Sequence, residues 1–220
     1  MKSLTAIPGV PPLIACFCLL LGWELLARIQ GLDSLPTAWE SLRELPAILS
    51  DPRSLNDIMS SIRRMIVGFA LALVFAIPVG LMMGRSRNVA AFFNPLFMVI
   101  YPVPKAALMP IIMLWLGIGD ASKTLVIFLG VSLPLIYHTY QGSKAVGEKL
   151  IWSGAAMGMS ARQRLLRIVL PAAMPEIMVG CRTGLVLALI TMVTSEMITR
   201  QAGIGNLLFN SLDLAQYSTT

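Results

Sequence analysis

Residues 152–175 read WSGAAMGMSARQRLLRIVLPAAMP, a polar and basic stretch that lies between two strongly apolar segments. Ser160 is followed three residues later by Gln163, the pattern of a capping box in which each side chain satisfies a backbone N–H that lacks a helical partner. We therefore expect a short helix to begin after Ser160. Its apolar residues recur at helical spacing while its arginines fall elsewhere on the wheel, so the helix is amphipathic and basic. Pro171 is expected to end this helix, and Gly158 to allow a sharp turn before it.

The composition is that of an integral membrane protein. Hydrophobic residues make up 56% of the 220 residues and charged residues only 13%, about half the charged share of a soluble domain. The length allows one compact membrane domain, predicted over residues 1–220. The net charge of +6 suits anionic lipid headgroups or an acidic partner surface. Nucleic acid is not expected as a partner, because the aromatic residues lie in apolar segments.

Five apolar segments are long enough to cross a bilayer, which takes about 20 residues. The predicted spans are about 3–26, 62–84, 90–118, 122–143 and 177–199, and residues 144–176 form a two-helix loop between the last two. We therefore predict an all-α integral membrane protein.

Other segments flank or interrupt these spans. A secretory signal peptide is the alternative for the first span, but apolar sequence continues through Cys16 to Leu26, where a mature domain should turn polar. Residues 31–60 are expected to form an external loop with short surface helices. The tail from residue 200 is too polar to span, and Gly203 and Gly205 predict a turn before a short amphipathic helix.

The third span is interrupted by Pro102, Pro104, Lys105 and Pro110, which predicts one kinked and partly unwound span. Irregular backbone at membrane depth persists only where it is buried in protein or lines an aqueous cavity. A lysine there costs about 2.5 to 3.5 kcal/mol on insertion scales. Lys105, with Pro102 and Pro104, is therefore our candidate for the lining of a transport pathway for small oxyanions. The alternative is that Lys105 reaches an interface and only packs.

No motif for enzymatic chemistry is present. The sequence has no phosphate-cradling GxxxxGK[ST] loop and no catalytic or metal-ligand constellation, so we expect no catalytic residue, metal or bound cofactor. Glu24, His138, Arg182 and Glu196 are interpreted as packing or interfacial residues. The three cysteines lie in or beside apolar segments, which predicts no disulfide framework.

The basic insert resembles the EAA loop of the membrane subunits of bacterial binding-protein-dependent ABC importers. That loop reads E-A-A-x-x-x-G, followed ten residues after the glycine by I-x-L-P. Here Gly158 is followed at that distance by Ile168, and then by Leu170 and Pro171. The first half departs from the pattern, because residues 152–154 are Trp, Ser and Gly instead of Glu, Ala and Ala.

The resemblance extends over nearly the whole chain. It includes GWELLAR at 22–28, RRMIVGFALALVFAIPVGLMMGRSR at 63–87, YPVPKAALMPIIMLWLGIG at 101–119 and SEMITRQAGIGNLL at 195–208. These segments resemble the corresponding segments of the family branch whose members handle nitrate, sulfonate, taurine and bicarbonate. Members of the family usually have six spans, so the sixth span is either absent here or missing from a truncated chain.

The resemblance implies a permease subunit that imports a small anion or organic solute across the bacterial cytoplasmic (inner) membrane. Two copies of the chain, or this chain and a similar partner, would enclose the pathway, and two cytosolic ATPase subunits would bind the ATP. A periplasmic or lipid-anchored binding protein would deliver the substrate. The residues expected to couple the permease to the ATPase are Gly158, Ser160, Arg162, Ile168, Leu170 and Pro171.

Two alternatives remain for the insert and for the transport mechanism. The basic helix can rest on lipid headgroups as an ordinary cytosolic loop. The chain can also work without ATP, as a secondary transporter or channel, although such carriers often contain internal repeats and no convincing repeat is found. A membrane-embedded enzyme is disfavoured because the titratable residues of the spans are scattered along the sequence.

Overall fold

The computed structural model describes residues 10–31 and 35–220, and every regular element in these residues is helical. The helices form two compact units. The first contains Met1–Met59 and Ala202–Thr220, and the second contains Ser60–Gln201. The expected all-α class is confirmed, whereas the single-domain organisation stays a prediction.

The first unit is built from α1 (Val10–Gln30), α2 (Ala38–Ser50), the start of α3 (Pro52–Arg85) and α10 (Ile204–Asp213). Trp23 donates its indole N–H to the carbonyl of Pro36 at 3.0 Å, which ties α1 to the segment before α2. The predicted short helix of the tail is α10. It begins at Ile204, so Gly205 is a buried helical residue and only Gly203, with φ of 135°, belongs to the turn.

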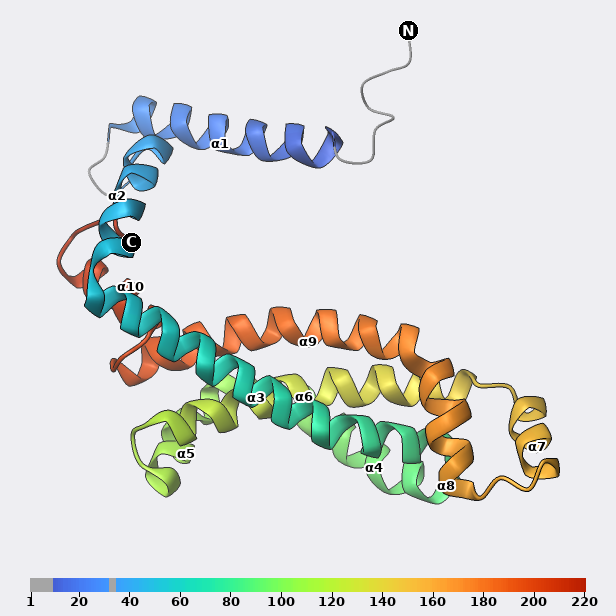
Figure 1. Ribbon diagram of the computed structural model, residues 1–220. Helices are drawn as coiled ribbons and strands as arrows, with labels where there is room; N and C mark the ends of the chain where they lie inside the picture. The colour runs from blue at the N-terminus through green and yellow to red at the C-terminus, as the bar shows by residue number, and fades with distance from the viewer. Residues whose placement is uncertain (1–9, 32–34) are drawn as a thin grey trace, which may run out of the picture. The chain divides into compact units, whose positions relative to one another are not determined.

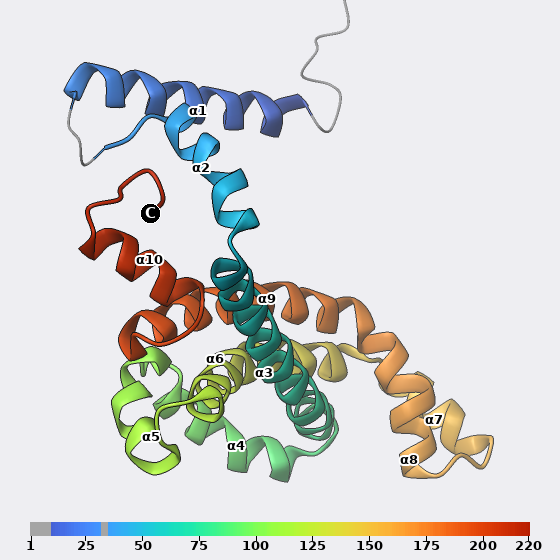
Figure 2. The ribbon, with the colours of Figure 1, turned by 60° about the vertical axis from the view of Figure 1, so that its left-hand side comes forward.

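The second unit contains the rest of α3, followed by α4 (Arg87–Ile100), a 3-10 turn η2 (Lys105–Leu108) and α5 (Met109–Leu116). The chain continues through α6 (Asp120–Ala145), α7 (Glu148–Ala156), α8 (Ala161–Arg164), a π-helical turn η3 (Leu165–Val169) and α9 (Leu170–Thr199). Helices α6 and α9 pack extensively against each other and run side by side (Figure 1). Within this unit α5 lies at the opposite end from α7 and α8 (Figure 2).

Helix α3 approaches α6 closely because small residues face it. A Cβ added at Gly80 would lie 2.5 Å from the Cβ of Thr139, so only glycine fits there. The same contact region contains a buried cluster that includes Ala76, Val79 and Leu135. Close backbone approach through small residues is how helices associate in lipid, where apolar burial gives little driving force.

Four helices of the described residues are long and apolar enough to cross a membrane: Pro12–Gln30, Pro52–Arg85, Asp120–Ala145 and Ala161–Thr199. A fifth crossing results if the bent pair Arg87–Ile100 and Lys105–Leu116 counts as one span. That pair bends by 82°. The predicted interruption of the third span is therefore confirmed.

The prediction that Pro171 ends the basic helix is wrong. Helices α8, η3 and α9 form one continuous run over residues 161–199, and Pro171 lies in the first turn of α9. Proline lacks an N–H and its ring crowds the preceding turn. The helix does not end here. It widens into a π turn, in which the backbone N–H of Leu170 donates to the carbonyl of Leu165, five residues earlier. Such single π turns interrupt α-helices without breaking them.

Candidate functional site

The turn between α7 and α8 has the hydrogen bonds of a Schellman motif. The N–H of Met159 donates to the carbonyl of Gly154 at 3.0 Å, and the N–H of Gly158 donates to that of Ala155 at 2.9 Å. Gly158 has a φ of +77°, a left-handed conformation that glycine adopts without steric cost. The expected sharp turn at Gly158 is therefore present.

Ser160 caps α8 as the sequence predicts. Its hydroxyl accepts from the backbone N–H of Gln163 at 3.3 Å, and its own N–H donates to the Gln163 side-chain oxygen at 2.8 Å. The two reciprocal bonds form a complete capping box. Ser160 thus has a local structural role, and its part in contacting another subunit stays a prediction.

A close contact holds α7 against the widened turn. A Cβ at Gly154 would lie 2.5 Å from Cδ1 of Ile168, so the absence of a side chain at Gly154 lets Ile168 reach the α7 backbone. Gly154 was not among the predicted site residues. The sequence signal for Gly154 is its position in the loop motif, where the family pattern has alanine, another small residue.

The buried side of the insert continues into the core of the second unit. Val169, Ala173 and Ile177 pack with Leu81 and Val146, and Leu165 and Leu170 lie against the same cluster. Arg85 at the end of α3 adds an ion pair with Glu148 at 2.6 Å. The insert is therefore fixed on the ends of both α3 and α9.

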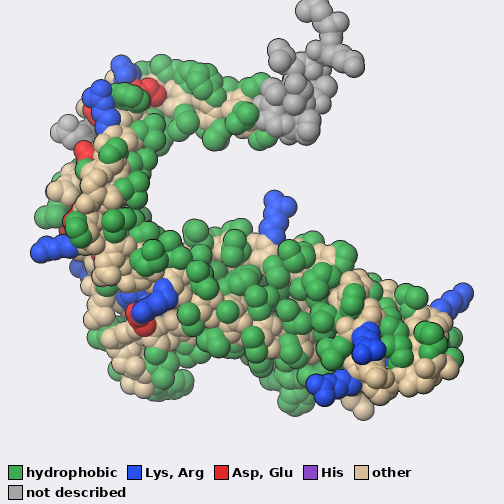
Figure 3. All heavy atoms as spheres, viewed as in Figure 1, with side chains coloured by type: hydrophobic (Ala, Val, Ile, Leu, Met, Phe, Trp, Pro, Cys, Tyr) green, Lys and Arg blue, Asp and Glu red, His purple; other side chains and the backbone are tan. Residues whose placement is uncertain are grey.

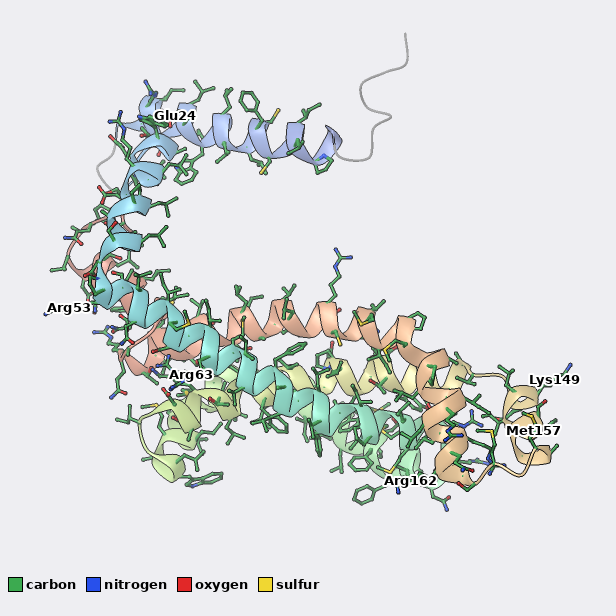
Figure 4. The ribbon with its side chains drawn as sticks, in the orientation of Figure 1. Glu24, Arg53, Arg63, Lys149, Met157 and Arg162 are labelled. Carbon is green, nitrogen blue, oxygen red and sulfur yellow. The ribbon has the colours of Figure 1, made fainter. Side chains whose placement is uncertain are left out.

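The outer side of the insert combines apolar and basic groups. Trp152 is 65% exposed and Met157 is 73% exposed, and Lys149, Arg162 and Arg167 are exposed as well. Figure 4 shows Lys149 and Met157 beside α7 and Arg162 beside α8, and basic side chains border hydrophobic ones at this end of the unit in Figure 3. Such a surface suits a partner that offers an apolar pocket with acidic groups around it.

Lys105 lies in the break between α4 and α5. Its ammonium donates to the carbonyls of Ile100 at 2.5 Å, Tyr101 at 3.0 Å and Val103 at 2.7 Å. These carbonyls belong to the end of α4 and the segment after it, where the helical ladder stops. Lys105 therefore stabilises the interruption. Whether it lines a pathway together with the exposed Pro102 and Pro104 stays a prediction.

A buried ionic cluster joins three spans at the end opposite to the insert. Arg64 of α3 pairs with Glu196 of α9 at 2.5 Å and with Asp120 of α6 at 2.6 Å. Ser61 donates to the Glu196 carboxylate at 2.8 Å, and Arg63 also pairs with Asp120. Glu196 is 0% exposed and Arg64 is 4% exposed. From the sequence, Glu196 was interpreted as a packing or interfacial residue, and no sequence signal predicted these partners.

His138 also pairs with a carboxylate. Its Nδ1 lies 2.8 Å from Oε1 of Glu176, across the α6–α9 contact. In the part of the chain that the structure describes, no three His, Cys, Asp or Glu side chains gather as a metal site would require.

Residues 76–220 match the model of a family described as binding-protein-dependent transport system inner membrane component. A putative ABC transporter permease protein of Methanocaldococcus jannaschii is 33% identical over 200 residues, which cover 88% of this chain and 75% of that protein. The taurine transport system permease protein of Escherichia coli is 33% identical over 195 residues, or 85% and 70% of the two chains. The nitrate import permease protein of Synechocystis is 28% identical over 211 residues, or 92% and 76%.

Proposed function

Since the chain belongs to the family of binding-protein-dependent transport system inner membrane components, whose members are transport subunits and not enzymes, we propose that it is a permease subunit of an ATP-driven importer. Two copies enclose the translocation pathway in a bacterial cytoplasmic membrane, and each copy binds one cytosolic ATPase subunit. A periplasmic or lipid-anchored binding protein delivers the substrate. The relatives named for taurine and nitrate support a small anion as that substrate.

The proposal is supported above all by the packing of the insert against the core of the second unit. Its outer side presents Trp152, Met157 and Arg162, while its inner side is part of the core cluster around Val169 and Ile177. A partner bound to the outer side therefore pulls directly on the spans. An ordinary loop on lipid headgroups would not need this internal packing.

The continuous helix over residues 161–199 transmits the movement of the ATPase to the membrane spans. Because α8 passes through η3 into α9 without a break, displacement of α8 by an ATPase is carried along α9. Helix α9 packs extensively against α6, so both spans follow. ATP-driven closure of the ATPase pair would thereby switch the pathway between its inward and outward openings.

Co-purification of this chain with the ATPase encoded beside it tests the docking role. We expect Trp152→Ala together with Met157→Ala to reduce recovery of the ATPase at least about tenfold, because exposed aromatic and apolar anchors dominate interfaces. The matched control is Trp115→Ala, since Trp115 is also exposed but lies in α5, away from the insert. Equal recovery with the double variant and the wild type would overturn the proposed docking surface.

A second measurement compares substrate uptake with ATP hydrolysis. A Gly158→Arg variant should insert into the membrane normally and still lose the coupling between uptake and ATP hydrolysis, because the turn that shapes the insert is distorted. Normal ATP-dependent uptake by this variant would count against the coupling role. Uptake in vesicles that lack ATP and any ATPase would favour a secondary transporter or channel instead.

A further inference from the structure

Three arginines line one cavity at the end of the second unit that carries the insert. The cavity has a volume of about 500 Å³ and lies between the end of α3, the start of α4 and the α8–η3 segment. Arg85 comes from the end of α3, and Arg162 and Arg164 come from α8. Figure 4 shows Arg162 beside α8 and near the start of α4. Among the residues that the structure describes, no carboxylate lines this cavity.

The positive charge of the cavity is only partly compensated within the protein. Arg85 pairs with Glu148 at 2.6 Å, but no carboxylate of the described residues forms an ion pair with Arg162 or Arg164. Arg164 is partly buried. A Cβ added at Gly154 would lie 3.4 Å from Cγ of Arg164, so the stem of this arginine packs against α7. A partly buried guanidinium without a counter-charge favours an anionic ligand.

The rest of the cavity is largely apolar and belongs to the end of a membrane span. Met82, Val89 and Leu165 line it together with the arginines. Met82 is 44% exposed and precedes Arg85 by about 4.5 Å along α3, and residues 65–84 of this span are uncharged. The cavity thus combines an apolar part at the end of the span with a basic part just beyond it. This combination fits an amphiphilic anion better than an acidic side chain of a soluble partner.

We propose that this cavity binds the phosphate group of an anionic phospholipid from the cytoplasmic leaflet. The inference rests on the proposed function for the side of the membrane on which the insert lies. Arg164 presents paired N–H groups to two phosphate oxygens, and Arg85 and Arg162 add positive charge. The acyl chains continue along the apolar surface of α3 that includes Met82. Basic pockets between span ends on the cytoplasmic side are typical binding places for such headgroups.

Native mass spectrometry of the assembled complex with its ATPase tests this site. The complex is reconstituted in vesicles of equal parts phosphatidylcholine and phosphatidylglycerol and then extracted gently, and the lipids that stay bound are counted. We expect the wild type to retain phosphatidylglycerol in preference to phosphatidylcholine. Arg164→Gln should lower the bound phosphatidylglycerol about tenfold, because the charge-assisted hydrogen bonds to phosphate are lost. Arg164→Lys should retain an intermediate amount, since it keeps the charge but loses the paired N–H groups.

Arg167→Gln is the matched control. Arg167 is exposed on the same helical run and does not line the cavity, so its replacement removes the same charge from the insert. This variant should retain as much phosphatidylglycerol as the wild type. Equal losses in Arg164→Gln and Arg167→Gln would overturn the inference, because lipid binding would then follow the net charge alone. Undiminished binding to Arg164→Gln would overturn it as well.

Two further results would point to other occupants and overturn the lipid assignment. Inorganic phosphate is added to the same complex before extraction. Phosphate that displaces all the bound phosphatidylglycerol would show a site for a free oxyanion. In preparations that contain both forms, phosphatidylglycerol on the free permease but not on the ATPase complex would show that acidic groups of the ATPase occupy the arginines.

These results are distinguishable from a failure of the proposed function. A wild-type complex that contains the ATPase but shows no preference for phosphatidylglycerol would refute the lipid site and leave the importer assignment intact. Recovery of the permease without any ATPase, with phosphatidylglycerol lost in Arg164→Gln and kept in Arg167→Gln, would refute the importer assignment and leave the lipid site intact.

Discussion

Replacing Glu196 by alanine removes the carboxylate at the centre of the buried ionic cluster. Arg64 then loses its partner at 2.5 Å, and the Ser61 hydroxyl loses the acceptor at 2.8 Å. Asp120 remains within 2.6 Å of Nε of Arg64. The guanidinium, at 4% exposure, has almost no access to solvent that could replace the lost oxygen. The variant therefore leaves a buried positive charge with weaker compensation.

The expected cost follows from that geometry. Breaking a buried ion pair by removing one partner costs about 3 to 5 kcal/mol. The bond to Asp120 offsets part of this, so we expect Glu196→Ala to lower the free energy of unfolding by about 2 to 4 kcal/mol. Replacing both charges, as Arg64→Met with Glu196→Leu, should cost less than about 1 kcal/mol, because apolar side chains of similar volume often substitute for a buried pair without loss.

Unfolding in mixed micelles with increasing SDS, followed by tryptophan fluorescence, measures these differences. The Arg63→Met variant is the matched control, because Arg63 also pairs with Asp120 but its side chain is 67% exposed; we expect a change below about 1 kcal/mol. The double-mutant cycle between Arg64 and Glu196 should give a coupling energy of about 2 kcal/mol or more. Additive single effects would refute the reasoning.

Three further predictions concern other positions. Gly158→Ala should destabilise the turn by about 1 to 2 kcal/mol, because residue 158 has a positive φ. Gly22→Ala within α1 should be neutral or stabilising. Amide exchange in each segment measures the two effects, and equal effects would contradict the prediction. Lys105→Met should lower the free energy of unfolding by about 1 to 3 kcal/mol, since three carbonyls lose their donor, and an unchanged SDS midpoint would disprove the stabilising role. Hydrogen bonds from the Ser54 hydroxyl and backbone N–H hold the pKa of the Asp51 carboxyl below its usual value. Asp51 therefore stabilises the start of α3 at any pH above the usual aspartate pKa. This stabilisation is lost as the pH falls through the lowered pKa of the folded protein. Asp51→Asn should keep the cap and abolish this pH dependence, measured by amide exchange in the first turn of α3.

Local features of the insert followed from the sequence because they depend on residues a few positions apart. The capping box needs only Ser160 and Gln163, and the turn needs only a residue that accepts a positive φ. The proline-rich interruption of the third span was predictable for the same reason. The prediction at Pro171 was wrong because the rule that proline ends a helix leaves out the π turn before it, in which Ile168 packs against the distant backbone of Gly154.

By itself the sequence determined that the chain is helical, crosses a membrane and contains a basic insert with marked ends, since hydropathy, length and capping are properties of contiguous residues. Only the tertiary structure decided that Arg64 meets Glu196, 132 positions away, and that Lys105 binds the carbonyls of the break. The physical reason is that each of these contacts depends on which helix faces pack together. That choice is made by the summed packing of all the spans, and no single stretch of sequence records it.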